Sequence, residues 1–431
     1  MALTDERESR GTRRPPIRWP FSFAGSRLNP WRGLDGLPRE VWLLFATNLI
    51  NRAGMMVLPF LILYLTRERG FTPGEAGLAF GLYGAAAIVA GPVGGRLSDR
   101  IGALTIMRVS LLLSGATLLL LGFARSRTAV FAAILLWAAC AELFRPASLA
   151  AITHVVLPEQ RKPAYALNRL AINLGMSIGP ALGGFLAAVS FQAMFFVDAA
   201  TTLVAGLVLS LAAWRSPTRS VTDGLEMTGR GSDSPGILRD TRLTIFLVST
   251  FLVGIVFYQH ESALPLYLVQ YLHLSPAFYG TLFTINTLLI VALEVPINRA
   301  TADWPNAWAL FIGCLLFAVG FGALGLVSSA TGVLITVVLW TFGEMMLFPA
   351  MAAHLGDIAP DDRRGAYMGA YSMALSLALT VGPWFGTQVL AGSGPAAVWS
   401  VMFVLGGMAA GLMVYAAPHR RPTRVPIAAE S

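Results

Sequence analysis

Charged side chains are scarce in this chain. Only 13% of its 431 residues are Asp, Glu, Lys or Arg, while 55% are hydrophobic. Soluble domains carry about 25% charged residues, so this chain has too few to cover a water-facing surface of its size. The same composition excludes a disordered chain, which needs low hydrophobicity. Much of the surface is therefore predicted to face a lipid bilayer.

Cysteine and histidine are also rare. Cys140 and Cys314 both lie inside apolar stretches, and the five histidines are scattered along the chain. These residues supply neither a disulfide framework nor a metal motif. A glycine-rich nucleotide-binding loop is missing as well. We therefore expect no enzyme activity, no cofactor and no bound metal.

What the chain has instead is a series of twelve long apolar runs. A helix needs about 20 apolar residues to cross the hydrocarbon core, and runs of this length without alternation are helices, not barrel strands. The predicted spans are 41–66, 75–95, 104–123, 128–152, 164–189, 193–213, 242–268, 277–298, 306–327, 331–352, 365–390 and 395–416. The predicted fold class is an all-α integral membrane protein with twelve transmembrane helices.

Lys and Arg are distributed unevenly between the two sides of these spans. With the N-terminus inside, 25 of the 31 fall in cytoplasmic segments and four fall in outer loops. The positive-inside rule then puts both termini in the cytoplasm of a cell (inner or plasma) membrane. It also explains the net charge of +8 without nucleic acid as a partner, because the basic residues do not gather on one soluble face.

The chain divides into two halves of six spans. Residues 1–40 form an Arg-rich cytoplasmic arm without the apolar core of a signal peptide. Residues 41–213 form one six-helix bundle, 214–241 a flexible linker, 242–416 the second bundle and 417–431 a cytoplasmic tail. The halves are similar at an offset near 202 residues, with Glu142 over Glu344. A parallel repeat of six spans is typical of transporters whose substrate site lies between the halves.

The loop between the second and third spans carries a specific motif, Gly95-Arg96-Leu97-Ser98-Asp99-Arg100-Ile101-Gly102. It resembles the G-x-L-a-D-R-x-G loop motif of the major facilitator superfamily, which implies two pseudo-symmetric six-helix bundles. The resemblance assigns a gating role to Gly95, Asp99, Arg100 and Gly102. Apart from the resemblance, the charges of this motif predict an electrostatic link at a helix end that breaks when the two halves rock.

The fifth span contains a second motif, from Gly175 to Gly184. It resembles the G-x-x-x-G-P-x-x-G-G motif of the drug:proton antiporters within that superfamily. The motif residues are Gly175, Gly179, Pro180, Gly183 and Gly184. Glycines four residues apart allow close approach of a neighbouring helix, and the proline bends the span. Sealing or pivoting against another helix and plain helix packing are both compatible with this pattern.

Seven ionisable residues lie at membrane depth, where each costs roughly 2.5–3.5 kcal/mol on insertion scales and is a functional hypothesis by default. They are Arg52, Glu142, Arg145, Asp198, Glu261, Glu294 and Glu344. The proton-coupling candidates among them are Glu344, Glu142, Glu261 and Asp198. Glu344 is preferred because it has no base nearby in the sequence. Glu142 and Arg145 share a helix face and either neutralise each other or face a cavity. For Asp198 and Glu294 we also consider a structural role or a role in gating.

A second group of residues gives the candidate substrate cavity. Arg52 lies eleven residues into the first span, about 16 Å deep at 1.5 Å per residue. The candidates combine amides, cations, adaptable methionines and the polar stretch of the seventh span. They are Asn48, Asn51, Arg52, Met55, Arg145, Tyr258, His260 and Met345.

These features predict a secondary transporter and leave two substrate classes open. The leading hypothesis is proton-coupled antiport that exports small lipophilic or drug-like compounds by alternating access; the export direction comes from the resemblance. The alternative is a transporter of an anionic solute, such as a peptide, sugar acid or lysolipid, that uses the intramembrane arginines. The expected partners are a small-molecule substrate, protons and the bilayer, and the expected state is a monomer.

Overall fold

The structure is a computed structural model in which residues 36–157, 160–214, 240–360 and 363–417 are described, apart from the side chains of Lys162 and Arg364. Residues 1–35 of the predicted arm, most of the linker and the tail after residue 417 lie outside these residues. Every regular element in the described ranges is helical. The elements of the first half are α1 (Arg39–Gly54), α2 (Val57–Arg67), α3 (Pro73–Ile101), α4 (Ala103–Phe123), α5 (Arg127–Glu142), α6 (Phe144–Val155), α7 (Arg161–Val189) and α8 (Phe191–Leu211). Those of the second half are α9 (Thr241–Phe257), η3 (Tyr258–Glu261), α10 (Ala263–Leu266), η4 (Tyr267–Tyr271), α11 (Pro276–Ala300), α12 (Asn306–Ala323), η5 (Leu324–Leu326), α13 (Ala330–Ile358) and α14 (Arg364–Ala416).

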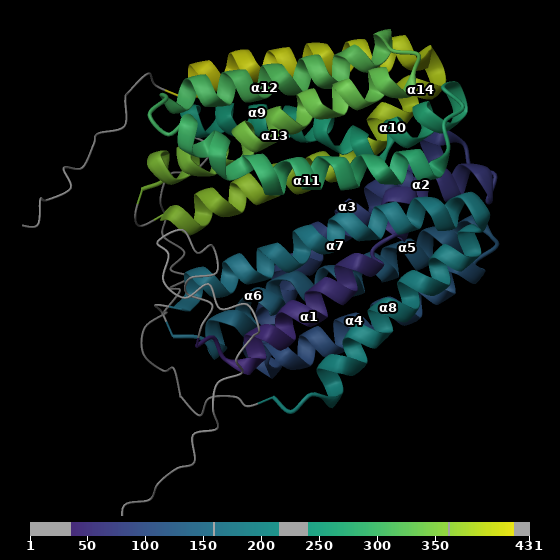
Figure 1. The fold of residues 1–431 in the computed structure, drawn as a ribbon, viewed down its shortest axis with the longest axis vertical. Helices are drawn as coiled ribbons and strands as arrows, with labels where there is room; N and C mark the ends of the chain where they lie inside the picture. The colour runs from purple at the N-terminus through teal and green to yellow at the C-terminus, as the bar shows by residue number, and fades with distance from the viewer. Residues whose placement is uncertain (1–35, 158–159, 215–239, 361–362, 418–431) are drawn as a thin grey trace, which may run out of the picture.

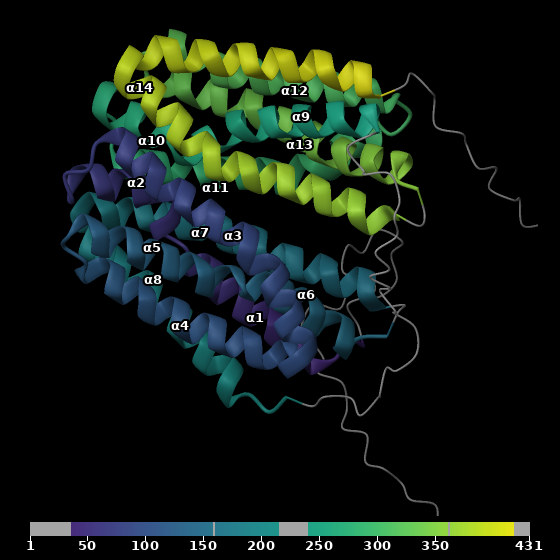
Figure 2. The same cartoon turned by 180° about the vertical axis from the view of Figure 1, so that it is seen from behind.

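Eleven helical stretches in the described residues are long and apolar enough to cross a membrane. The last stretch, α14, has 53 residues and contains one non-helical residue, Gly394, with φ 80° and ψ 179°. At 1.5 Å per residue this is about 80 Å of helix, more than twice the hydrocarbon thickness of roughly 30 Å. The chain reverses at Gly394, where only glycine adopts this backbone conformation easily, so α14 makes two passes (Figure 2). The prediction of twelve spans is confirmed.

Three spans expected as continuous helices are interrupted. The first is broken at Met55-Met56, between α1 and α2, and the fourth is broken at Leu143, between α5 and α6. The seventh passes through a 3-10 turn, η3, and a π-helical turn, η4. Such irregular backbone is tolerated at membrane depth only where protein or a cavity satisfies its polar groups. The residues around these breaks must therefore satisfy the freed backbone groups.

Five helices that begin at the predicted outer side share one starting signal. Each is preceded by a Ser or Thr whose hydroxyl accepts a hydrogen bond from a backbone N–H of the first turn. These residues are Thr72, Ser126, Ser190, Ser275 and Ser329. Thr72 also forms a reciprocal capping box with Glu75. The caps satisfy amides that lipid cannot satisfy, which is why the spans start at these residues.

The two halves of the chain form two helix groups, α1–α8 and α9–α14 (Figures 1 and 2). Contacts between the groups are made chiefly by α7 against α11 and by α3 against α14. The groups are close at the end that carries α2 and α10, and their ribbons diverge toward the opposite end (Figure 1). That opposite end is the one predicted to be cytoplasmic.

Candidate functional site

The break in the first span is held by Asp198 on α8. One carboxylate oxygen, Oδ2, accepts hydrogen bonds from the backbone N–H groups of Met56 at 3.0 Å and Val57 at 2.8 Å. The other, Oδ1, accepts from the hydroxyl of Thr202 at 3.4 Å. Asp198 is only 2% exposed. Its side chain therefore caps the N-terminus of α2 inside the membrane, where the freed amides have no water.

The break also packs against the glycine motif of α7. A Cβ atom at Gly179 would lie 2.8 Å from the carbonyl oxygen of Arg52, and one at Gly183 would lie 2.9 Å from Cβ of Met56. A Cβ at Gly175 would meet the backbone N–H of Ala53 at 2.8 Å. These glycines are required because the backbone of the first span approaches α7 closely.

The last part of the same motif contacts the other bundle. A Cβ at Gly184 would lie 2.6 Å from the carbonyl oxygen of Pro276 on α11. Tyr279, one turn further along α11, donates its hydroxyl to the backbone carbonyl of Pro59 at 3.2 Å and of His260 at 2.9 Å. The two bundles are therefore sealed together at the predicted outer side.

Two further contacts complete this interface. Toward the middle of α3, a Cβ at Gly84 would lie 2.8 Å from the backbone N of Thr380 on α14, whereas one at Gly91 or Gly95 would meet nothing within 4 Å. Deeper along α7, the guanidinium of Arg169 donates to both carboxylate oxygens of Glu294 on α11, at 2.8 and 3.1 Å. Glu294 is thus part of an ion pair that joins the bundles.

A cavity of about 50 Å³ lies within the first bundle, beside the break. Its lining includes six residues that the sequence singled out: Asn51, Arg52, Met55, Glu142, Arg145 and Asp198. Arg52 is poorly satisfied there. Its Nη1 donates to the sulfur of Met55 at 3.1 Å, and its buried Nε has no hydrogen-bond partner. Within the described residues no carboxylate lies within 4 Å of this guanidinium.

The pairing of Glu142 with Arg145 is not formed. The phenol of Tyr83 donates to Glu142 at 2.8 Å, and no ion pair joins Glu142 to Arg145 within the described ranges. The expected helix face is interrupted because α5 ends at Glu142 and the helix starts again at Phe144. The neutralisation hypothesis for this pair was therefore wrong.

A larger cavity of about 170 Å³ lies between α7 and the second bundle. Its walls include the aromatic residues Phe257, Tyr279, Phe283 and Trp340. Its polar groups include Asn173, Asn286, His260 and Glu344, and the indole N–H of Trp340 has no partner among the described residues. Glu344 is the one carboxylate of the lining.

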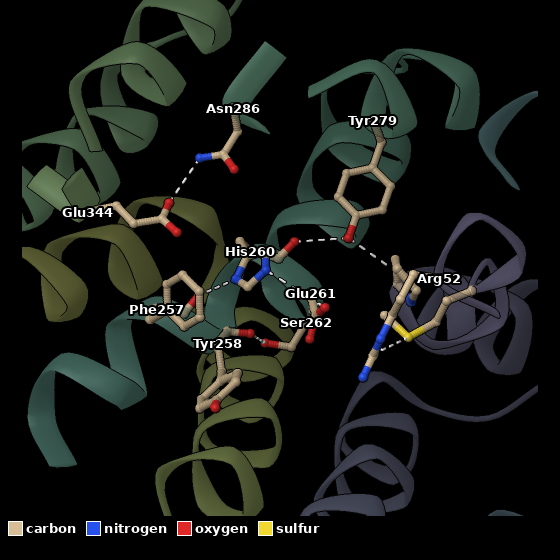
Figure 3. Close-up of polar contacts among 11 residues, drawn as sticks. Arg52, Phe257, Tyr258, His260, Glu261, Ser262, Tyr279, Asn286 and Glu344 are labelled. Carbon is tan, nitrogen blue, oxygen red and sulfur yellow. Dashed lines mark hydrogen bonds and ion pairs between the residues drawn. The ribbon is translucent and has the colours of Figure 1, made fainter. Parts of the chain in front are cut away.

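Glu344 does have a fixed neighbour, which the sequence had not indicated. The amide nitrogen of Asn286 on α11 donates to Oε2 of Glu344 at 2.9 Å (Figure 3). It also donates to the hydroxyl of Thr341 at 3.0 Å. The expectation of a carboxyl without a fixed partner was therefore incorrect. The partner is a neutral amide and not a cation, so it places no permanent positive charge beside the carboxyl.

Some predicted cavity residues lie elsewhere. Asn48 is 2% exposed and donates to the carbonyl of Leu44 and to the side chains of Ser148 and Asn168, so it joins three helices. Met345 is 1% exposed and packed. Neither of them lines either of the two cavities, and the same is true of Tyr258.

The loop motif lies at the C-terminal end of α3, the end predicted to be cytoplasmic. Asp99 and Arg100 are exposed, and in the described part of the chain neither side chain makes a hydrogen bond or ion pair. Gly102, with φ 92°, links α3 to α4. The gating role of this motif stays a prediction.

The sequence profile of the Major Facilitator Superfamily matches residues 43–271 and 246–431. The chain belongs to this superfamily. It is an all-α transporter with the twelve-span fold, and a multi-span membrane protein as expected for a plasma-membrane location.

Curated relatives are found within this superfamily. The chain is 27% identical over 350 residues to the uncharacterised transporter YqjV of Bacillus subtilis, covering 80% of this chain and 85% of that protein. It is 25% identical to a Na⁺, Li⁺, K⁺/H⁺ antiporter of Planococcus maritimus, covering 80% and 90%. It is 23% identical to the multidrug resistance protein MdtH of Shigella boydii, covering 83% and 86%.

Solved structures have the same fold. A POT family transporter in complex with 5-aminolevulinic acid aligns with a TM-score of 0.74 at 15% identity, over 90% of this chain and 98% of that one. The human organic anion transporter MFSD10 aligns with a TM-score of 0.61 at 18% identity, over 87% and 100%. At these identities the likeness concerns the fold alone.

Sequence reasoning missed Asn173, Asn286 and Trp340. Each lies within an apolar run, on α7, α11 or α13, and a polar side chain at membrane depth was the available signal for the two asparagines. Asn48 and Asn51 in the first span were selected on that ground, and the same criterion applied to the eighth span would have found Asn286.

Proposed function

We propose that this transporter exports small lipophilic compounds in exchange for protons, and that the cavity of about 170 Å³ receives the substrate. The observation that carries the proposal is Glu344. It lines an otherwise largely apolar cavity, and a neutral amide, Asn286, is its hydrogen-bonding partner. A carboxyl in such surroundings can exchange a proton as the polarity around it changes.

In this mechanism the proton and the substrate compete for Glu344. A substrate that enters from the cytoplasmic side displaces the proton and lies against Phe257, Phe283 and Trp340. Rocking of the bundles then opens the outer side, where a new proton displaces the substrate. The seal at Tyr279 and Gly184 supports this mechanism, because it closes the outer side while the cavity borders the interface.

The relatives support proton coupling at a general level. One is named a cation/H⁺ antiporter and another a multidrug resistance protein. An acidic residue in a largely apolar cavity with aromatic walls fits lipophilic compounds better than a bare alkali cation, which prefers several oxygen ligands.

The proposal is tested in proteoliposomes. A pH gradient is imposed, and internal pH is recorded while a panel of lipophilic compounds is added to the wild type, Glu344→Gln and the control Glu68→Gln. Glu68 follows α2 and is exposed at the outer end. We expect substrate-dependent proton flux in the wild type and in Glu68→Gln, and its loss in Glu344→Gln. Substrate movement that ignores the gradient and survives Glu344→Gln would contradict the proposal.

Arg52 supports a second candidate, transport of an anionic solute. Its buried Nε has no partner, its Nη1 meets only a thioether, and Arg145 lines the same cavity. A carboxylate or phosphate would satisfy these donors. Uptake or release of labelled anions that is lost in Arg52→Gln and intact in Glu344→Gln would favour this candidate over drug export.

A further inference from the structure

His260 and Glu261 form a buried pair at the turn η3. Their side chains are 12% and 10% exposed, and Nε2 of His260 lies 3.8 Å from Oε1 of Glu261. In the described residues this is the only polar contact of the Glu261 carboxyl. Figure 3 draws the pair between Glu344 on one side and Arg52 on the other.

The direction of the neighbouring hydrogen bond fixes the imidazole. Nδ1 of His260 lies 2.6 Å from the backbone carbonyl of Phe257. A carbonyl only accepts, so Nδ1 carries a hydrogen and donates it. Nε2 is therefore the atom that gains or loses a proton, and it faces the carboxyl.

This arrangement disfavours the fully deprotonated pair. A neutral imidazole would then direct the lone pair of Nε2 at a carboxylate that no described donor reaches, and an unpaired buried charge is costly. Adding one proton removes the conflict in either of two ways. Imidazolium faces carboxylate, or neutral imidazole accepts from a protonated carboxyl.

From this geometry we propose that His260 and Glu261 together form one proton-binding site, separate from Glu344. The proposal rests on the proposed proton-coupled function and adds a second proton site to it. His260 also lines the larger cavity with Glu344, so the proton site borders that cavity. The pair then links the cavity to the interface between the bundles.

The other ionisable groups around the pair come from several helices. Tyr83 of α3, Tyr279 of α11 and Tyr258 of η3 interact electrostatically with Glu261. On further elements, Arg52 of α1 interacts with Tyr83, and Glu142 and Arg145 interact with Tyr258. Glu344 of α13 shares the cavity with His260. None of these groups lies within ion-pair distance of the Glu261 carboxyl.

The first test measures proton binding without substrate. Purified full-length protein in detergent is titrated between pH 5 and pH 9, with proton uptake and infrared carboxyl bands recorded. His260→Asn keeps a donor for the Phe257 carbonyl but lacks the Nε2 atom, and Glu261→Gln keeps the shape of the side chain. We expect each single variant to lose or shift the midpoint of the same one-proton titration, because the remaining group has lost its partner, and the double variant to lose that one proton and no more.

Glu344→Gln is the matched control. It removes a different buried carboxyl, so combining it with Glu261→Gln should remove a further proton. Glu261→Asp keeps a titrating group and should retain the proton with a shifted midpoint, which covers failure of Glu261→Gln to fold. The proposal is overturned if the two single losses add in the double variant, or if neither single variant changes the titration.

The transport arm separates this inference from the proposed function. If wild-type protein shows substrate-dependent proton flux and His260→Asn and Glu261→Gln leave its proton stoichiometry unchanged, the pair is not the second coupled site and the inference fails. If the wild type shows no such flux but the shared proton is found, the proposed function fails and the proton site stands.

Discussion

Asp198 is a buried carboxylate for which two roles were considered. The sequence suggested a proton carrier or a structural group, and the structure shows a cap on the amides of Met56 and Val57. We expect Asp198→Ala to destabilise the protein by about 1–3 kcal/mol, the range for leaving buried donors unsatisfied. Asp198→Asn keeps an acceptor and should cost less. Thermal unfolding in detergent measures both.

The transport activity of Asp198→Asn provides the second half of this prediction. If the residue acts as a cap, proton-coupled flux should persist in Asp198→Asn at a reduced rate. Complete loss of proton coupling in a well-folded Asp198→Asn protein would instead favour a role as proton carrier.

Arg52 gives the opposite expectation for stability. Its guanidinium has a buried Nε without a partner and no carboxylate within ion-pair distance in the described residues. Replacing poorly compensated buried charge with an apolar group of similar volume is often neutral or stabilising by roughly 1–4 kcal/mol. We therefore expect Arg52→Met to unfold at the same temperature as the wild type or higher. A clear drop in unfolding temperature would mean that Arg52 has an essential structural partner.

At the scale of single helices, Asp240 caps α9. Burial raises the pKa of Asp240, but hydrogen bonds from the Tyr367 hydroxyl and the amides of Leu243 and Arg242 outweigh it and hold the pKa below its usual value of 3.8. Removing the cap in Asp240→Ala should cost about 0.5–2 kcal/mol. A depressed pKa stabilises the folded state above the unfolded value, so this contribution should disappear as the pH falls below 3.8.

Stability curves at two pH values check this expectation. Asp240→Ala should unfold earlier than the wild type at pH 7, and the two proteins should converge under strongly acidic conditions. A difference that stays constant with pH would show that the charge of Asp240 has no part in the cap.

The contact between α7 and α11 gives a prediction about conformation. A Cβ at Gly280 would collide with the carbonyl oxygen of Pro180, so Gly280→Leu should separate the bundles at the outer side. Spin labels on a cysteine-free background, at the exposed positions Glu68 and Gly392, should move apart in this variant. An unchanged distance distribution would show that the outer seal does not depend on this contact.

For the whole molecule, we propose that both ends of the chain lie in the cytoplasm. The bias of Lys and Arg toward one side supports this orientation. In intact cells, a membrane-impermeant maleimide should label Glu68→Cys and leave Arg299→Cys unlabelled until the membrane is opened. The native Cys140 and Cys314 are buried and should contribute little background. The reverse labelling pattern would invert the proposed direction of transport.

The sequence predicted the fold to a greater depth than the site. Apolar length and turn chemistry located all twelve spans, because lipid imposes the same demand on each helix. The break at Met55-Met56 was missed, since its cause is a carboxylate 141 residues away from Val57. Asn286 meets Glu344 only after α11 packs beside α13, so no local pattern could pair them.

Helix α7 has one property whose effect concerns speed and not stability. Its glycines present bare backbone both to the break in the first span and to α11, so at these positions α7 contributes no side chain to the contact. Interdigitated side chains must separate before two helices can slide past each other, whereas a contact through glycine backbone has fewer side chains to separate. A small activation enthalpy for turnover is the consequence, with transport that slows only moderately on cooling.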